Sequence, residues 1–581
     1  MIVAMKAWVL LGCRCFLGVG IAATQTLTAG ELPRFSRITT GPIVLNSTSS
    51  VAGSWADFDN DGDLDLYVTT LLDNNGPLTN AQLFRNDGAL VFTVITMGPV
   101  VNTPAKTGGG AWADYNNDGN LDLFVTAGGN NLLFRNDGGG NFTRITSGDI
   151  VNEFGYWNGA AWGDYDRDGW VDLYVTRGAT QMPNCLYHNN RDGTFTKVTG
   201  TPPVTDAETS YGCSWVDYDG DGAPDIFVAN FDEDGGDPEN PHATCSLYRN
   251  EGGGSFTKMT SAQVGTIVSD SRAWEGCAWA DYDSDGDMDC YICNATGPDA
   301  LYRNDGGTFM AVLSGGVGTD SKYAIMAGWS DVENDGDLDL FVTNYANQND
   351  ALYLNDGSGG FTAVTGTDPA IDGIYSMGVA FGDFTNDGYP DLFIGAHEMN
   401  GERPFYVNGG GSNHWLKVKL VGNASNKWGI GAKVDASATI GGSPRIQRRV
   451  IEAGNNYLSP SNLSADFGLG NSLTATVTVT WPSGCVQTVL NVGANQTILV
   501  TEPSPASNSA ITFTGHTILP DKSMKLEVLG IPCRVHTIEA STDLVTFASI
   551  GAATADAAGL FSFIDSDAAL LHRRYYRITQ P

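Results

Sequence analysis

A nine-residue acidic segment recurs seven times along this chain of 581 residues, at intervals of 50 to 64 residues. In the first copy, Asp57, Asp59, Asp61 and Asp65 occupy positions one, three, five and nine, and Gly62 occupies position six. An aromatic-bearing stretch precedes each copy and an alternating apolar stretch follows it, which is typical of a strand, a tight loop and a second strand. Because the chain is too long for one ordinary core, this repeat must shape most of the fold.

Two further elements complete each repeat. A stretch of the type Leu-Phe/Tyr-Arg-Asn-Asp-Gly predicts a strand that runs into a turn, and a Phe-Thr-x-Val/Ile-Thr stretch predicts a fourth strand. With one exception, the Phe of this last stretch precedes the next acidic loop by 22 positions. The Phe-Thr stretches begin at Phe35, Phe92, Phe142, Phe195, Phe256, Phe309 and Phe361.

The first and last repeats are incomplete in complementary ways. After the seventh loop a third strand is expected at 404–408, but the chain then enters Gly409-Gly410-Gly411 instead of a Phe-Thr strand. The unpaired copy is the first one, at 35–39. If that strand completes the last sheet, the sheets close into a ring without an exposed edge, which an open solenoid would not explain. We therefore predict an all-β chain with a seven-bladed β-propeller over residues 31–411.

The register of the acidic positions predicts metal sites. Alternate side chains of a tight loop turn to one side, glycine at position six permits the bend, and the carbonyl at position seven adds an oxygen. Hard oxygen donors without Cys or His favour calcium over zinc or copper. Position twelve, where an EF-hand has Glu, is Val68, so Asp65 must replace that ligand. We predict up to seven Ca²⁺ ions; solvated acidic turns, the alternative, would not explain the fixed register.

The second and seventh loops lose a charge through Asn116 and Thr385, so they should bind the metal more weakly. The predicted ligands, with position seven acting through its carbonyl, are Asp57, Asp59, Asp61, Asp63 and Asp65; Asp114, Asn116, Asp118, Asn120 and Asp122; Asp164, Asp166, Asp168, Trp170 and Asp172; Asp217, Asp219, Asp221, Ala223 and Asp225; Asp281, Asp283, Asp285, Asp287 and Asp289; Asp331, Glu333, Asp335, Asp337 and Asp339; and Asp383, Thr385, Asp387, Tyr389 and Asp391.

The stretch from Asp57 to Leu66, with Gly53 and Trp55 before it, resembles the FG-GAP/VCBS repeats of integrin α-subunit propellers and of many secreted bacterial proteins. The resemblance covers residues 31 to about 411. It implies that the loops bind calcium on one face of the ring. It does not identify a partner.

A different pattern begins at residue 412. Val/Thr-rich and Gly-rich runs at 414–418, 429–434, 467–470 and 479–484 predict a compact β domain over 412–502. Their order resembles the ASPIC/UnbV domain of the cartilage acidic protein family and its bacterial relatives. A Pro/Ser-rich linker at 503–510 leads to strand-like runs at 511–581, which are similar to C-terminal sandwich modules of secreted bacterial proteins. We expect two small β-sandwich-like modules.

The charge and the N-terminus predict location. A net charge of −35 argues against nucleic-acid partners and leaves no basic patch for anionic lipid. Residues 1–30 contain Lys6, an apolar run and small residues, which predicts a signal peptide rather than an uncleaved anchor helix. We expect a secreted or cell-surface protein with no membrane span after cleavage. Export permits disulfides, and the hairpin register predicts that Cys277 and Cys293 lie opposite each other and pair.

No arrangement typical of a catalytic site occurs in the sequence, since the seven His residues are scattered and no nucleophile elbow or phosphate loop is present. We therefore predict a non-enzymatic scaffold for adhesion or for recognition of an extracellular protein or glycan. The alternative is a polysaccharide-active hydrolase or lyase that uses acids such as Asp232, Glu233 or Asp234.

Aromatic residues recur shortly before the first strand of several repeats, where a propeller gathers its connections on the face opposite the acidic loops. They predict either a binding platform or packing of the central channel. These residues are Tyr156, Trp157, Tyr211, Trp274, Tyr323 and Tyr375.

Overall fold

The computed structural model describes residues 35–45, 50–70, 78–178, 182–231, 244–312, 316–319, 321–366, 368–371, 373–397, 403–454, 463–504, 511–570 and 573–579. The predicted signal peptide, most of the linker at 503–510 and the segment with Asp232, Glu233 and Asp234 lie outside these ranges. The described chain is all-β apart from single helical turns. Those turns are α1 (Pro42–Leu45), α2 (Asp149–Asn152), α3 (Ser261–Val264), η1 (Pro202–Val204), η2 (Thr266–Val268) and η3 (Ser566–Leu570).

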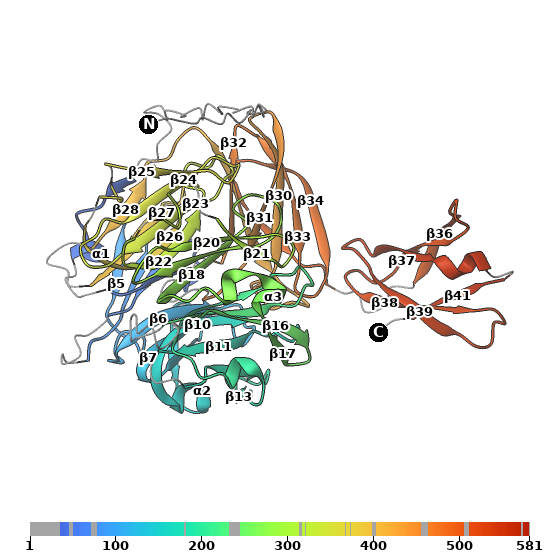
Figure 1. Ribbon diagram of the computed structural model, residues 1–581, viewed down its shortest axis with the longest axis horizontal. Coiled ribbons are helices and arrows are strands. Elements are labelled where there is room, and N and C mark those ends of the chain that lie inside the picture. The colour runs from blue at the N-terminus through green and yellow to red at the C-terminus, as the bar shows by residue number, and fades with distance from the viewer. Residues whose placement is uncertain are drawn as a thin grey trace, which may run out of the picture. The chain divides into compact units, whose positions relative to one another are not determined.

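Antiparallel sheets of four strands make up the repeat region (Figure 1), and β10 pairs with both β7 and β11, so that two such groups share one eight-stranded sheet. The strands after β1 are β2 (Gly53–Ala56), β3 (Asp65–Val68), β4 (Gln82–Asn86), β5 (Phe92–Ile95), β6 (Thr107–Ala113), β7 (Asp122–Asn130), β8 (Leu132–Asn136), β9 (Phe142–Ile145), β10 (Phe154–Gly163), β11 (Asp172–Arg177), β12 (Cys185–Asn189), β13 (Phe195–Lys197), β14 (Ser210–Val216), β15 (Asp225–Asn230), β16 (Ser246–Gly252), β17 (Ser255–Lys258), β18 (Trp274–Ala280), β19 (Asp289–Asn294), β20 (Ala300–Asn304), β21 (Phe309–Val312), β22 (Ala324–Ser330), β23 (Asp339–Asn344), β24 (Ala351–Asn355), β25 (Phe361–Val364), β26 (Tyr375–Gly382), β27 (Asp391–His397) and β28 (Phe405–Asn408).

The first strand of the chain belongs to the last sheet of the repeat region. Strand β1 (Phe35–Arg37) pairs antiparallel with β28, with Phe35 opposite Asn408, and the sheet order is β1-β28-β27-β26. This is the pairing that the surplus first strand and the missing last strand predict. It joins the two ends of the repeat region through backbone hydrogen bonds.

Aromatic stacking connects neighbouring repeats. In five of the seven loops the residue at position two lies against the Trp in the first strand of the next repeat, as with Tyr115 and Trp162, whose ring centroids are 6.3 Å apart. The same contact joins Phe384 of the seventh loop to Trp55 of the first repeat, at 5.1 Å. Trp55 and Trp162 are both 1% exposed, so these stacks form part of the buried core.

An asparagine at the end of each third strand also links each repeat to the previous loop. Its side-chain amide donates to the carbonyl oxygen of position two, over 2.9 Å from Asn86 to Phe384. This bond connects the first repeat with the seventh. The other pairs, at 2.7 to 2.8 Å, are Asn136 with Phe58, Asn189 with Tyr115, Asn250 with Tyr165, Asn304 with Tyr218, Asn355 with Tyr282, and Asn408 with Val332.

Two sheets form each C-terminal module. In the first module, β29 pairs antiparallel with β32 and parallel with β35, and the second sheet has the order β31-β30-β33-β34. The second module has the sheets β36-β37-β40 and β39-β38-β41. The strands are β29 (His414–Val421), β30 (Lys433–Ile440), β31 (Ser443–Val450), β32 (Ala465–Gly470), β33 (Thr474–Thr480), β34 (Val486–Gly493), β35 (Gln496–Thr501), β36 (Thr512–Ile518), β37 (Met524–Leu529), β38 (Val535–Ser541), β39 (Ala548–Thr554), β40 (Leu560–Asp565) and β41 (Tyr575–Thr579).

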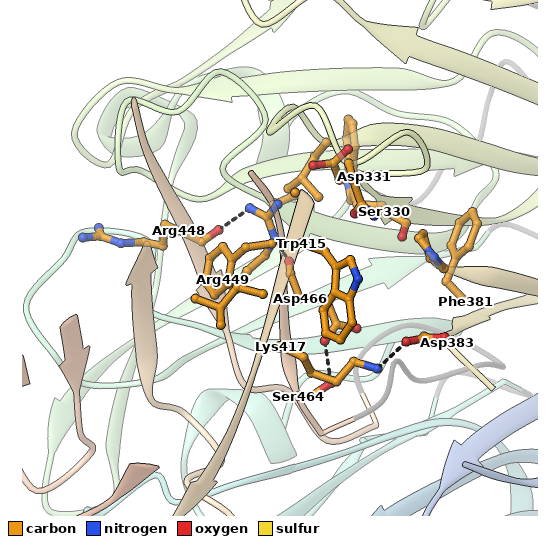
Figure 2. A pocket seen from close by; sticks show the side chains of 18 of the residues that line it. Ser330, Asp331, Phe381, Asp383, Trp415, Lys417, Arg448, Arg449, Ser464 and Asp466 are labelled. Carbon is orange, nitrogen blue, oxygen red and sulfur yellow. Dashed lines mark hydrogen bonds and ion pairs between the residues drawn. The ribbon is translucent and has the colours of Figure 1, made fainter. Parts of the chain in front are cut away.

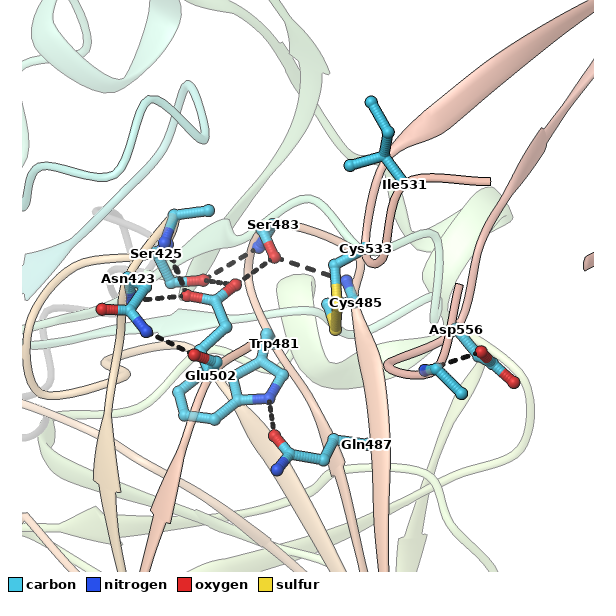
Figure 3. The surroundings of a disulfide bond; sticks show 12 residues. Asn423, Ser425, Trp481, Ser483, Cys485, Gln487, Glu502, Ile531, Cys533 and Asp556 are labelled. Carbon is cyan, nitrogen blue, oxygen red and sulfur yellow. Dashed lines mark hydrogen bonds between the residues drawn. A yellow bond between two sulfur atoms is a disulfide. The ribbon is translucent and has the colours of Figure 1, made fainter. Parts of the chain in front are cut away.

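A disulfide between Cys485 and Cys533 connects the two modules (Figure 3). The sequence left this pairing open. Close to it, the buried Glu502 carboxylate accepts the backbone N–H groups of Asn423 and Ser425, at 2.7 and 2.8 Å. These bonds hold the chain in place where the first module ends.

The predicted Cys277–Cys293 disulfide is wrong. In the hairpin of β18 and β19, Ala280 lies opposite Asp289, so that Cys277 faces Ile292. The prediction placed Asp281 opposite Asp289, which is a slip of one residue, and such a slip turns a side chain to the other face of the sheet. Both cysteines are buried, and neither forms a disulfide.

The link between repeats can be tested at Asn189. Its side chain donates to the carbonyls of Tyr115 and Val171 and accepts the N–H of Arg191. Asn189→Ala removes these three bonds and leaves buried carbonyls without a donor, so we expect the free energy of unfolding to fall by about 2–4 kcal/mol. Urea unfolding followed by tryptophan fluorescence measures this. The exposed neighbour supplies the control, because Asn190→Ala should cost under about 1 kcal/mol; equal losses in both variants would contradict the role of Asn189.

Candidate metal centre

The seven acidic loops share one backbone conformation. In every loop a carboxylate oxygen at position one accepts the N–H of the glycine at position six, over 2.7 to 3.2 Å. That glycine has a φ of 86 to 103°. The residue at position four is also left-handed, with φ of 55 to 72°, although it is Asn, Arg, Ser or Gly. Sequence reasoning missed position four, whose frequent Asn was the available signal.

The aspartate at position nine clamps each loop. Both oxygens of Asp289 accept backbone N–H groups, one from Tyr282 at 3.2 Å and one from Asn304 at 2.8 Å. In all seven loops one oxygen accepts the N–H of the linking asparagine, over 2.7 to 2.9 Å. Position nine therefore has a structural task besides the ligand role that the sequence predicts.

In each of four loops, potential ligand atoms of three residues lie within 4.8 Å of one another. Among the described residues the second, sixth and seventh loops form no such group. The groups are Asp57, Asp59 and Asp61; Asp164, Asp166 and Asp168; Asp217, Asp219 and Asp225; Asp281, Asp283 and Asp285; and, beside the third loop, Asp166, Asp172 and His188.

Several buried oxygens of the loops have no hydrogen-bond partner. A buried carboxylate oxygen without a donor is costly unless a cation neutralises it. Unpartnered oxygens grouped in this way are the donor set that suits a hard divalent cation, so the residues present fit calcium. The unpartnered oxygens are Oδ1 of Asp57, Asp59, Asp166, Asp217 and Asp283, and Oε2 of Glu333.

Burial raises the pKa of the loop carboxyls. Desolvation raises the pKa of Asp114 to about 6 and that of Asp164 to about 7, and neighbouring carboxylates raise both further. At position nine, burial raises the pKa of Asp65 and Asp289 to about 9. A bound cation would oppose these shifts, because it favours the charged form.

A histidine of strand β12 that sequence reasoning missed contacts the third loop. His188 Nδ1 lies 3.1 Å from Asp172 Oδ1 and 3.6 Å from Asp166 Oδ2. The contact with Asp172 raises the pKa of His188. The signal was a departure from the repeat pattern, since His188 stands where four other repeats have the Arg of Leu-Phe/Tyr-Arg-Asn.

Arginines of the repeats already neutralise some loop carboxylates. Arg249 Nε lies 2.6 Å from Asp219 Oδ2, and its Nη2 lies 2.8 Å from Asp221 Oδ2. Arg191 contacts Asp168 at 2.5 Å. Arginine side chains therefore supply part of the positive charge that neutralises the loop carboxylates.

A cavity of about 130 Å³ lies where the first C-terminal module meets the fifth, sixth and seventh loops (Figure 2). Trp329 and Asp331 line it from the repeat region, and Trp415, Lys417 and Arg449 line it from the module. Ionic contacts and aromatic packing thus meet on the side of the repeats that carries the acidic loops.

The predicted aromatic platform divides into two sets. Trp157 and Trp274 are buried, at 3% and 0% exposure, and the Trp157 indole donates to Gly129. Both indoles belong to buried hydrophobic clusters, so they are not available as a binding surface. The tyrosines are more accessible: Tyr156 is 64% exposed, Tyr211 contacts Phe231, and Tyr323 and Tyr375 both contact Tyr345.

Two protein-family models match the chain. An FG-GAP-like repeat model matches residues 57–125, 114–175, 177–228, 235–292 and 331–394, which together exceed half of the chain. The chain belongs to the FG-GAP-like repeat family. A second model, ASPIC and UnbV, matches residues 422–507, so the first C-terminal module of this FG-GAP-like chain is an ASPIC and UnbV domain.

The curated relatives have low sequence identity to this chain. Cartilage acidic protein 1 of Homo sapiens is 27% identical over 312 residues, which cover 52% of this chain and 37% of that protein. The Mus musculus protein is 29% identical over 260 residues, covering 42% and 39%. The matched part therefore spans less than half the length of these relatives.

Solved structures align at low scores. An Agrocybe aegerita lectin that recognises non-reducing terminal N-acetylglucosamine aligns with a TM-score of 0.41 and 18% identity, over 60% of this chain and 85% of the lectin. BBS1N in complex with ARL6DN aligns with a TM-score of 0.42 and 10% identity, over 64% and 97%.

Glu275 offers a test of burial away from the metal loops. It lies in β18 at 4% exposure, and burial raises its pKa to about 8 from 4.5. A pKa raised by folding contributes stability below pH 4.5 that is lost as the pH rises through about 8. We expect Glu275→Gln to lack this loss. The free energy of unfolding of the variant should therefore rise relative to that of the wild type by a few kcal/mol between pH 5 and pH 9.

Urea unfolding of both proteins at pH 5, 7 and 9 measures the difference. The exposed Glu251→Gln variant is the control, and its stability should follow the wild type at every pH. If the free energy of unfolding of Glu275→Gln and of the wild type changed with pH in parallel, Glu275 would ionise in the folded protein without loss of stability.

Proposed function

We propose that this FG-GAP-like chain is an exported, calcium-stabilised scaffold for recognition of an extracellular protein or glycan, and not an enzyme. The observation that carries the calcium part is the set of buried, unpartnered oxygens at Asp57, Asp59, Asp166, Asp217 and Asp283. A folded ring needs a cation to hold these oxygens close together, and an ion that binds only the folded state stabilises it.

The repeats of this scaffold form one closed seven-bladed propeller. Pairing of β1 with β28 supports closure through the backbone. The bond from Asn86 to Phe384 supports it through side chains, since it repeats at the closing point the link found between all neighbouring repeats. A closed ring exposes no sheet edge, which suits a protein whose working surface must stay free of self-association.

Calcium in the loops would neutralise clustered carboxylates and fix the bends between the first two strands of each repeat. In the first loop Asp57, Asp59 and Asp61 would hold it. Asp65 stays with its backbone partners and sets the loop's position on the sheet. The protein's own contribution is therefore a preformed loop whose donors need little rearrangement.

Export is supported by two features. Residues 1–30 have the pattern of a signal peptide. Cys485 and Cys533 form a disulfide between the modules, and such bonds persist in oxidising compartments. Among the described residues no helix has the length and apolar character that a membrane crossing requires.

Recognition is assigned to the tyrosine-bearing ends of the first strands. Tyr156, Tyr211, Tyr323 and Tyr375 keep part of their surface accessible, whereas many acidic-loop atoms are engaged by the chain itself. Tyrosine combines apolar area with a hydroxyl donor, which suits a glycan or protein ligand.

Calcium binding is tested with the chain lacking residues 1–30. We expect the metal-free protein to bind at least four calcium ions, one for each loop that groups three ligands, and to gain at least about 10 °C in thermal midpoint. Calorimetry and native mass spectrometry count the ions. Asp281→Asn should lose one ion, and magnesium should stabilise less, because it demands smaller octahedral sites. Absence of bound ions would remove the calcium function.

The disulfide tests export. Peptide mapping of the exported protein without reduction should link Cys485 to Cys533 and find Cys277 and Cys293 as thiols. Cys533→Ser should leave the calcium stoichiometry unchanged, because neither cysteine belongs to a group of potential metal ligands in the described part of the chain. Free thiols at both Cys485 and Cys533 would argue against passage through an oxidising compartment.

A further inference from the structure

The ASPIC and UnbV module places a lysine inside the seventh acidic loop. Lys417 of β29 extends its ammonium to within 2.9 Å of Asp383 Oδ2, position one of that loop (Figure 2). The side chains of Lys417 and Asp383 are 8% and 3% exposed. Burying an ammonium costs several kcal/mol unless carboxylates neutralise it, so the geometry of this contact must be maintained by its surroundings.

Those surroundings cap the whole loop. The indole of Trp415 packs directly on Gly388, where a Cβ atom would lie only 2.0 Å from the ring. Tyr389 donates its hydroxyl to the carbonyl of Asn413 at 2.8 Å. Contacts on both sides of Lys417 therefore keep it over the loop, and β29 is itself fixed between β32 and β35.

Both oxygens of Asp383 are engaged, and one of them already holds a cation. Oδ1 accepts the N–H of Asp387 at 3.1 Å, and Oδ2 accepts both Lys417 and the N–H of Gly388. The hydroxyl of Thr385, at position three, donates to Asp391. The seventh loop thus presents one carboxylate fewer than the first loop, and a side-chain ammonium stands at its position one.

The third loop provides the comparison. Asp164 accepts the same two backbone N–H groups, from Asp168 and Gly169, both at 2.9 Å. It is buried like Asp383, at 4% exposure. No lysine of the module is paired with Asp164 among the described contacts, and its carboxylate groups with those of Asp166 and Asp168. The two loops differ in what neutralises position one and in position three, which is Asp166 in the third loop and Thr385 in the seventh.

Two other module lysines reach the loops without filling them. Lys433 Nζ lies 2.5 Å from Asp217 Oδ2, but Asp217 Oδ1 is buried and unpartnered. Lys419 Nζ lies 3.8 Å from Asp57 Oδ2, and Asp57 Oδ1 is likewise unpartnered. Each of these loops keeps a buried oxygen without a partner at position one, whereas both oxygens of Asp383, at position one of the seventh loop, are engaged.

We propose that Lys417 is the resident cation of the seventh loop, so that this loop takes no calcium in the intact chain and instead anchors the ASPIC and UnbV module to the repeats. The inference rests on the proposed calcium function of the other loops. It divides these sites by chemistry: divalent ions serve the loops with grouped carboxylates, and a lysine serves the seventh loop, where Thr385 replaces the third-position carboxylate.

Removing the lysine should create a calcium site. We expect Lys417→Met to be less stable than the wild type in a chelator, to bind one ion more at saturating calcium, and to gain more in thermal midpoint from calcium. The double variant Lys417→Met/Asp383→Asn should lose that extra ion. Lys419→Met is the matched control and should bind the same number of ions as the wild type.

A second pair of variants keeps Lys417. These variants test whether the seventh loop binds calcium even if Lys417→Met does not fold. Asp164→Asn should lose one ion, and Asp383→Asn should lose none. Loss of an ion in Asp383→Asn, or an unchanged ion count in folded Lys417→Met, would overturn the proposal while the wild type still binds calcium. If the wild type itself binds none, the calcium function fails, and the proposal fails with it.

Discussion

The fold of the repeat region depends on a buried aspartate that is bonded to two strands at once. At position nine of each loop the carboxylate accepts the N–H of an asparagine on the third strand, as Asp225 does from Asn250 at 2.7 Å. The same asparagine donates its side-chain amide to the previous loop, at 2.8 Å to Tyr165. Each acidic loop is therefore both a turn within one repeat and the attachment point of the next, so loop geometry and ring geometry cannot vary independently.

This arrangement has an electrostatic cost. Loops that are buried enough to connect the repeats also bury carboxylates, and burial raises the pKa of Asp225 to about 8. The chain relieves part of the cost with its own cations, through Arg249 in the fourth loop and Lys417 in the seventh. The proposed calcium ions serve the oxygens that remain unpartnered, so metal and side-chain cations have the same physical task.

The ASPIC and UnbV module shares this task and a hydrophobic core with the repeats. Ala453 accepts the backbone N–H of Trp162 at 2.7 Å, and Trp162, Leu416 and Trp481 belong to one buried cluster. Apolar contact supplies adhesion between the module and the repeats, and the lysines set the register of that contact on the loops. Recognition of an outside partner is therefore expected on surfaces that the module leaves accessible.

Local spacing in the sequence determined much of this protein: the four strands per repeat, the loops with Gly62 at the bend and the two modules follow from patterns within segments. The pairing of β1 with β28 follows from the phase of the repeat, which has a surplus strand at its start and lacks one at its end. Only the tertiary structure decided that Asn250 bonds to Tyr165, that Cys277 faces Ile292, that Trp157 is buried and that Lys417 enters the seventh loop. The reason is physical. A periodic pattern records which face of a strand a residue occupies, whereas a contact between residues far apart in the chain depends on how whole sheets pack, and a one-residue shift in register is enough to change it.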